Sequence, residues 1–255
     1  MPPGAGIGLE LENNQVQANG SGTLGADWKW KGSYTWNQNL RQANPGGTPL
    51  PVVANPAVDL ERNSHTLRTE FTYGEWQDPY SGTLGVEGLF EDQESTGSTG
   101  LTPGGQIENL ALFGIGRYAG ERWSFEAGLR FDRRSQEADP SQTADSSLLE
   151  NRVDPVTGAP VEVNLDNEYN VLTASVGAVY DLTDSFALAA NINRGFRAPG
   201  LFELYANGVH GGVAAVQFGE AGLDEETSLG SDLQARWRAE NLDLTATVYV
   251  TEFTD

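Results

Sequence analysis

The alternation of apolar and polar side chains along this chain is the feature that most constrains its fold. In residues 123–131 every second side chain is apolar, and these positions are Trp123, Phe125, Ala127, Leu129 and Phe131. Successive side chains of a β-strand point to opposite faces, so this spacing predicts a strand with one apolar face. The same pattern recurs at 172–180, 186–192, 229–238 and 242–250. Helical periodicity is hard to find, and the chain is predicted to be all-β.

The connections between the predicted strands are alternately short and long. Turn-forming residues mark short connections around 77–79, 120–122, 182–184 and 240–241. The long connections are polar and cover roughly 37–64, 92–108, 135–168 and 195–227. A soluble β-sandwich rarely carries four loops of this length, whereas an outer-membrane barrel has short periplasmic turns and long extracellular loops. Weaker alternation at 7–11, 27–36, 67–75, 80–90 and 109–119 completes about ten or eleven strands.

The length and the ends of the predicted strands match a membrane. Each apolar stripe runs for about 9 to 12 residues, the span of a tilted membrane strand. Aromatic residues lie near strand ends, as at membrane–water interfaces, although packing in a sheet core is the alternative reading. These residues are Trp76, Tyr80, Trp123, Tyr180, Phe186 and Trp237. The sequence therefore predicts an antiparallel transmembrane β-barrel with an apolar outer face. Its lumen would be lined by polar residues such as Glu126, Arg130, Gln234, Arg236 and Thr247.

Composition and motifs exclude several functions. The formal net charge of −21 argues against nucleic-acid binding, which needs a basic surface. The chain has no cysteine, so neither a disulfide nor a cysteine-based metal site can form. Its two histidines, His65 and His210, lie far apart, and no G-x-S-x-G, HExxH or P-loop motif is present. The chain is predicted not to be an enzyme.

One segment carries a specific motif. Gly195-Phe196-Arg197-Ala198-Pro199 is followed by Glu203-Leu204-Tyr205, and the acidic run 222–228 then opens the next strand. This segment resembles the late barrel region of TonB-dependent outer-membrane receptors of Gram-negative bacteria. The resemblance implies energy-coupled uptake of a scarce nutrient, such as a siderophore–iron chelate, a metal or a cobalamin-like cofactor. It also implies contacts with outer-membrane lipid and lipopolysaccharide, with a small-molecule ligand, and with the inner-membrane TonB complex through a plug domain.

The motif loop supplies the candidate site residues. They are Arg194, Gly195, Phe196, Arg197, Pro199, Glu203 and Tyr205. In a structural interpretation, Arg194 and Arg197 are the cations nearest Glu203, and Arg–carboxylate pairs brace the root of the loop over the lumen. In a functional interpretation, Arg197, Glu203 and Tyr205 contact the ligand directly. Gly195 permits φ values that are closed to other residues.

Two metal sites are also candidates. His210 ends a Glu-Leu-Tyr-x-x-Gly-x-His sequence similar to that of a receptor subset that includes zinc-uptake members, and imidazole is a common zinc ligand. A packing role in the loop is the alternative. The acidic loop 135–168 could bind Ca²⁺ or bridge to lipopolysaccharide through divalent cations, because hard cations prefer oxygen ligands; a solvated loop is the alternative. No other cofactor is expected.

The chain is predicted to be part of a larger barrel. It ends inside a predicted strand, and residues 1–255 contain no recognisable plug or TonB-contacting segment. Barrels of this family have about 22 strands, so the plug and the remaining strands would be absent. An open half-barrel exposes two unpaired edges, and we expect residues 1–255 not to fold or transport alone. The alternatives are a passive porin, an outer-membrane enzyme barrel, and a soluble extracellular β-protein.

Overall fold

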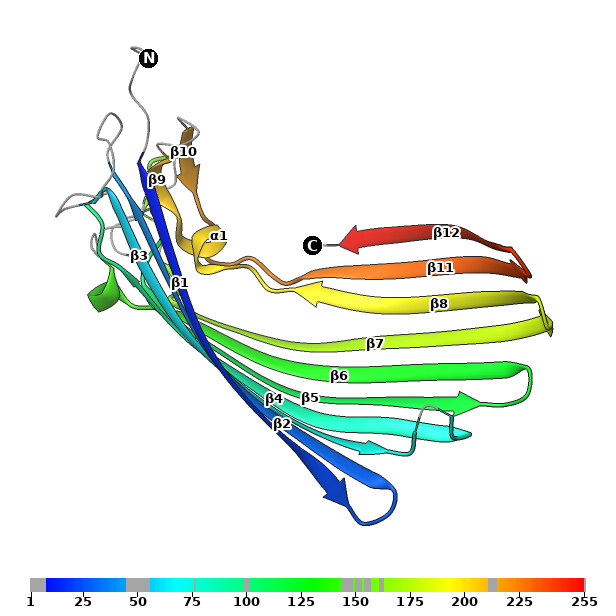
Figure 1. Cartoon of the computed structure of the whole chain (residues 1–255). Helices are drawn as coiled ribbons and strands as arrows, with labels where there is room; N and C mark the ends of the chain where they lie inside the picture. The colour runs from blue at the N-terminus through cyan, green and yellow to red at the C-terminus, as the bar shows by residue number, and fades with distance from the viewer. Residues whose placement is uncertain are drawn as a thin grey trace.

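The computed structural model consists almost entirely of one antiparallel sheet (Figure 1). It describes residues 8–44, 56–75, 77–98, 101–143, 149, 153, 157–160, 163–210 and 215–254. Ten strands pair in the order β1-β2-β3-β4-β5-β6-β7-β8-β11-β12. Their bounds are β1 (Leu9–Leu24), β2 (Trp28–Ala43), β3 (Val58–Tyr73), β4 (Tyr80–Ser95), β5 (Gly105–Ala119), β6 (Trp123–Ala138), β7 (Asp166–Thr183), β8 (Phe186–Arg197), β11 (Glu226–Ala239) and β12 (Leu242–Thr254). The predicted all-β, antiparallel fold is confirmed.

The strands are longer than predicted. β2, β3, β4 and β6 each contain 16 residues and β7 contains 18, so the long connections are shorter than the sequence indicated. The extra length lies at the long-loop end, where both faces carry polar side chains. The hydrogen-bonded ladder continues there without an apolar stripe, and the alternation of hydropathy on which the prediction relied disappears.

β1 is the largest departure from the prediction. Only its first residues were expected to form a strand, but it runs to Leu24 and pairs with β2 along its whole length. Its sequence is rich in Asn, Gln, Gly and Ser, which are poor strand signals. Tertiary packing explains two of the glycines. A Cβ at Gly22 would lie 2.7 Å from the Trp30 ring and one at Gly20 would lie 3.3 Å from it, so these glycines make room for that ring.

The sheet has two chemically different faces. On the outer face large apolar side chains are exposed, with Leu112 at 61%, Leu129 at 59% and Leu233 at 57% of full accessibility. On the inner face polar and charged side chains face one another across neighbouring strands. An aqueous protein does not leave so large an apolar surface uncovered, so the outer face is suited to contact lipid hydrocarbon.

Aromatic rings gather on the outer face close to the short turns. Ring centroids of the cross-strand partners Trp28 and Tyr73 lie 5.4 Å apart, those of Tyr80 and Tyr118 lie 5.2 Å apart, and those of Trp123 and Tyr180 lie 4.2 Å apart. This arrangement matches an aromatic girdle at a membrane interface. Trp76, which the sequence placed in the same group, lies outside the described residues.

The sheet is strongly curved and open (Figure 1). β1 and β12 lie at its two edges, and the long connections gather at one end of the strands. None of the helices in the described part of the chain is long and apolar enough to span a membrane.

The connection between β8 and β11 was expected to lack structure, and this expectation is wrong. It contains a helix, α1 (Leu201–Tyr205), and a hairpin of β9 (Asn207–His210) and β10 (Ala215–Phe218). A second short helix, η1 (Pro140–Gln142), follows β6. Apolar side chains of α1 bury against the inner face of the wall, and this burial supplies the ordering energy that local sequence does not. The site described next depends on this docking.

Candidate functional site

A charged network crosses the middle of the inner face. Glu87 on β4 accepts hydrogen bonds from Arg68 Nη1 on β3 and from Arg130 Nη2 on β6, both at 2.8 Å. Arg130 Nε also donates to Asp132 Oδ2 at 2.8 Å. The Arg68 guanidinium lies 4.3 Å from the centre of the Phe113 ring on β5. These contacts join four consecutive strands in the middle of the inner face, and each charge has a partner of opposite sign.

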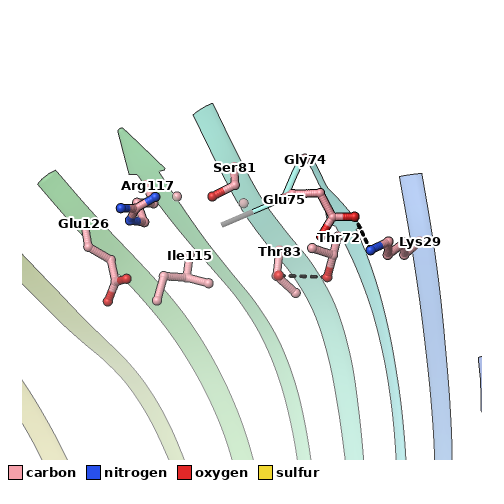
Figure 2. Close-up of a pocket in the computed structure, with 11 residues that line it drawn as sticks. Lys29, Thr72, Gly74, Glu75, Ser81, Thr83, Ile115, Arg117 and Glu126 are labelled. Atoms are coloured by element: carbon pink, nitrogen blue, oxygen red, sulfur yellow. Dashed lines mark hydrogen bonds and ion pairs between the residues drawn. The ribbon is translucent and has the colours of Figure 1, made fainter. Parts of the chain in front are cut away.

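A polar pocket lies at the short-turn end of the inner face (Figure 2). Its volume is about 270 Å³. An ion pair joins Lys29 to Glu75 at one side, and the hydroxyls of Thr72 and Thr83 are 2.9 Å apart on the floor. Ser81, Arg117 and Glu126 are among its other lining residues. A wall of hydroxyls and fixed charges of this kind suits a water-filled lumen.

The motif loop is clamped at its root by Arg197. Arg197 Nη1 and Nη2 donate to the two carboxylate oxygens of Glu203 at 2.7 and 2.9 Å, and Nε donates to Glu226 Oε2 at 2.7 Å. The Gly200 backbone N–H also donates to Glu203 Oε2, at 2.8 Å. Arg197 is the last residue of β8 and Glu226 the first of β11, so one guanidinium ties both strands to α1. The Arg197 side chain first, and the Gly200 amide second, lower the pKa of Glu203.

Behind the clamp, α1 is packed into the wall. Leu204 and Tyr205 are fully buried, and Leu201 joins them in one apolar cluster with Ile107 and Ala138 of the inner face. The buried ring of Tyr205 keeps its hydroxyl satisfied, because Asn167 Nδ2 donates to the hydroxyl at 2.6 Å and the hydroxyl donates to the Asn164 carbonyl at 3.0 Å. The loop therefore folds over the inner wall at the long-loop end.

Pro199 is buried at the start of this connection, where its carbonyl accepts a hydrogen bond from Gln136 Nε2 at 2.8 Å. Gln136 is itself 1% exposed. Gln136, Asn167 and the Arg68–Glu87 pair were not predicted from the sequence to be site residues. The only available signal was the period-2 spacing that places polar residues on the inner face, and it could not distinguish a structural contact from a solvated one.

Arg194 is separated from the other motif residues. Arg194 lies three residues before Arg197 on β8, and because successive side chains alternate between faces, the two arginines project to opposite faces. Arg194 is on the outer face, where its Nη1 donates to the backbone carbonyl of Leu172 at 3.0 Å. In the described part of the structure, the ion pair of Glu203 is therefore with Arg197 and not with Arg194. Phe196 also lies on the outer face, opposite Thr227.

Gly195 does not use the φ freedom that a glycine permits. It lies within β8, opposite Ser228, and is not among the glycines with a positive φ. A Cβ at this position would lie 3.0 Å from Ser228 Oγ. A side chain at this position would therefore press on the Ser228 hydroxyl of the neighbouring strand.

Most of the candidate metal ligands lie outside the described residues. The backbone of His210 lies at the end of β9, opposite Ala215, but its side chain is outside the described part of the structure. Several acidic residues of the 135–168 loop are also outside it, namely Asp145, Glu150, Asp154 and Glu162. Among the described residues, no group of three or more His, Cys, Asp or Glu side chains could hold a metal ion. The described residues Arg133 and Glu168 of this region form an ion pair at 2.8 Å.

A curved antiparallel sheet with a lipid-matching outer face, a charged inner face and loops gathered at one end is the wall of an outer-membrane β-barrel. Comparison with known proteins specifies which kind. A family model described as "TonB dependent receptor-like, beta-barrel" matches residues 4–255, and the chain belongs to this family. It is accordingly an outer-membrane protein.

Solved structures share this fold. The chain is similar to the copper transporter OprC, with a TM-score of 0.71 and 17% identity over 94% of this chain. It is also similar to the hemophore receptor HasR of Serratia marcescens, with a TM-score of 0.68 and 15% identity over 96% of this chain. The chain spans only 40% of the length of each of these two proteins. No curated protein matches the chain.

Proposed function

We propose that this chain forms part of the wall of a transporter that takes up a scarce nutrient across the outer membrane with energy supplied through TonB. The family supports the transport class, and the structural neighbours include a copper transporter, a hemophore receptor in complex with heme, and a ferric yersiniabactin uptake receptor from Yersinia pestis. The cargo proposed for this chain is of the same broad kind, a metal or a metal chelate.

The observation that carries this proposal is the loop after β8. Arg197 clamps the loop root, and α1 is buried against the inner face instead of extending away from the wall. A loop held over the mouth of a polar lumen can contact a solute before it enters and can restrict free passage. The Gly195–Pro199 and Glu203–Tyr205 motif of this loop, which a passive porin lacks, favours gated uptake over a porin.

The test is uptake by cells that express the complete coding region containing this chain. Radiolabelled copper, ferric citrate and heme would be offered to cells with and without TonB. Accumulation of at least one cargo should require both the protein and TonB, and it should stop when the inner-membrane proton gradient is collapsed. Uptake that continues in cells lacking TonB would instead identify a passive pore.

The ligand role of the motif loop is a separate proposal. Arg197 pairs with Glu203, and the Tyr205 hydroxyl is hydrogen-bonded to Asn167 of the wall; these contacts support a bracing role. The side chains of Arg197 and Glu203 are also partly exposed, so a ligand could reach them. Arg197→Ala and Glu203→Ala should lower uptake of the identified cargo. Unchanged folding and unchanged uptake in both variants would rule out both roles.

A further inference from the structure

Two residues of the inner wall hold the two ends of the connection between β8 and β11. At its start, the Pro199 carbonyl accepts a hydrogen bond from Gln136 Nε2 at 2.8 Å. Near its other end, the Leu223 carbonyl accepts one from the Tyr169 hydroxyl at 3.1 Å. Gln136 and Tyr169 are 1% and 5% exposed, so water competes little for either contact. The connection is therefore tied to the wall both where it leaves β8 and shortly before it enters β11.

A third wall residue holds the middle of the same connection. Asn167 Nδ2 donates to the Tyr205 hydroxyl, at the end of α1, at 2.6 Å. Asn167 on β7 is the register partner of Gln136 on β6. Tyr169 is two positions further along β7, so its side chain projects to the same face. Gln136, Asn167 and Tyr169 thus form one continuous anchor patch with three donors for three separate points of the connection.

Arg134 sets the orientation of the Gln136 amide in this patch. Arg134 Nη2 donates to Gln136 Oε1 at 3.3 Å, while the amide nitrogen faces the Pro199 carbonyl. A guanidinium donates hydrogen bonds and accepts none, so it selects the amide oxygen as its neighbour. The same amide then meets Pro199 as a donor, which is what a carbonyl requires.

The anchor patch divides the connection into a base and a hairpin. The base consists of residues 199–206 and 219–223, and the hairpin consists of β9 and β10. Where the hairpin leaves the base, the Gly219 N–H donates to the Ala206 carbonyl at 2.6 Å. A Cβ on Gly219 would lie 2.5 Å from the Tyr205 nitrogen, so the returning chain passes directly against α1. In the described part of the structure β9 and β10 pair with each other alone, beyond α1 at the long-loop end (Figure 1).

The base and the hairpin also differ in burial. Leu204 and Tyr205 of the base are fully buried, whereas Val216 and Phe218 of the hairpin are 57% and 50% exposed. Segments with few buried apolar contacts open at the lowest free energy, and segments packed into a core open last. The hairpin can therefore change position at little cost, whereas displacing the base breaks the three anchoring hydrogen bonds and exposes an apolar cluster.

We propose that Gln136, Asn167 and Tyr169 are positioning residues that keep the base docked throughout uptake, so that the hairpin alone changes position when cargo is captured. The fixed base sets the direction from which the hairpin reaches over the lumen. The capture step rests on the proposed function, whereas the docking of the base is a property of the protein without cargo. The two parts can therefore fail separately.

Hydrogen exchange on the purified complete protein in detergent tests the docking. Tyr169→Phe removes one hydroxyl, and Gln136→Glu removes the N–H donor but keeps the oxygen that Arg134 contacts. Tyr180→Phe in the outer aromatic girdle and Gln17→Glu at an exposed position of β1 make the same chemical changes away from the patch, so they are the matched controls. Heat-dependent mobility in gels checks the folding of each variant.

In the unmodified protein, amides of the base should exchange at least about tenfold more slowly than those of the hairpin. Each patch variant should speed exchange of the base by about fivefold, because a buried hydrogen bond is lost, and should leave the hairpin unchanged. The controls should match the unmodified protein. Equal protection of base and hairpin would overturn the proposal, as would folded patch variants that behave like their controls.

Uptake kinetics separate a positioning role from a general loss of stability. For whichever of copper, ferric citrate and heme is transported, the two patch variants should raise the concentration at half-maximal uptake severalfold. Their maximal rate per folded receptor should stay unchanged, whereas a merely unstable barrel would lose folded protein and leave that concentration as it was.

The same cargo, added to the purified protein, should slow exchange in the hairpin and leave the base as it was. A base that loses protection when cargo binds would contradict the proposal. If none of the three cargoes is transported, the proposed function fails, and the exchange comparison without cargo still decides whether the patch anchors the base.

Discussion

Arg197 illustrates how much one side chain can decide in this molecule. Its guanidinium contacts two carboxylates that are separated by more than twenty positions in sequence, and both contacts are at 2.7 Å. The planar group presents its donors in a fixed fork, which a lysine could not reproduce. Because Glu203 also binds the Gly200 amide, the clamp sets the direction in which the chain leaves β8.

Glu203→Gln should loosen the loop root. The amide keeps the size of the side chain but removes its charge, and the Glu203 side chain is 39% exposed, so solvent screens the pair. We expect a loss of about 1 kcal/mol or less in the free energy of local opening, or up to about a fivefold faster hydrogen exchange at residues 200–205. Glu121→Gln in a short turn makes the same charge change and should leave exchange in this segment unaltered. Identical exchange in the two variants would show that the clamp does not hold the loop.

The clamp should also respond to acid. The pKa of Glu203 is lowered from its ordinary value of 4.5 by Arg197 and the Gly200 amide. A carboxylate whose pKa falls on folding contributes stability that is fully present above its unfolded value and is lost as the pH drops through the folded value. Hydrogen-exchange protection of residues 200–205, corrected for the intrinsic pH dependence, should therefore be constant above about pH 5 and decline only below 4.5. A decline between pH 8 and pH 6 would contradict this assignment.

Among the elements, the strands β3 to β6 depend on side-chain pairing more than on a core. The inner face carries no apolar layer in its middle section, and Glu87 lies between two guanidiniums there. The register of these strands is thus supported by cross-strand charge contacts on one face and by lipid-facing packing on the other.

Glu87→Gln should destabilise the wall, because it leaves Arg68 and Arg130 close together without the carboxylate between them. We expect a loss of about 2 kcal/mol, since partly buried charged groups would lose their hydrogen-bond partner. The temperature at which the folded band disappears in gels measures this change. Glu126→Gln is the matched control: it also lies on the inner face, and no ion pair of Glu126 occurs among the described residues. A control that loses as much stability as Glu87→Gln would assign the effect to net charge.

For the whole molecule, the decisive property is the difference between the two faces of one sheet. Neighbouring residues on a strand meet different solvents: Leu233 projects to the outer face, whereas Gln234 donates to Thr247 on the inner face. The family assigns the outer face to the hydrocarbon of the outer membrane. A substitution should therefore have opposite consequences at adjacent positions.

Leu233→Arg should impair assembly in the membrane, whereas Gln234→Arg should be tolerated. An arginine on the lipid face near the bilayer midplane costs about 2 to 4 kcal/mol, and the lumen side hydrates the same group. The fraction of folded protein in isolated outer membranes measures the difference. If both variants assembled equally well, the assignment of the outer face to lipid would be wrong.

The sequence alone was sufficient for the all-β class, the alternation of short turns and long loops, and the faces of the best strands. These features are local, because each follows from side chains two positions apart or from turn-forming residues. The stripe from Trp123 to Phe131 and the lumen position of Arg130 are examples. The motif beginning at Gly195 carried enough information to identify the family, which the match over residues 4–255 shows.

Only the tertiary structure decided the rest, because it depends on contacts between residues distant in sequence. The polar strand β1 exists because β2 pairs with it, and α1 is ordered because Leu204 and Tyr205 find buried partners on β5, β6 and β7. The sequence named Arg194 and Arg197 alike as the cations nearest Glu203, and it could not reveal that they lie on opposite faces and that Glu203 folds back onto only one of them. A pattern in sequence determines which way a side chain points, and the fold determines what it meets there.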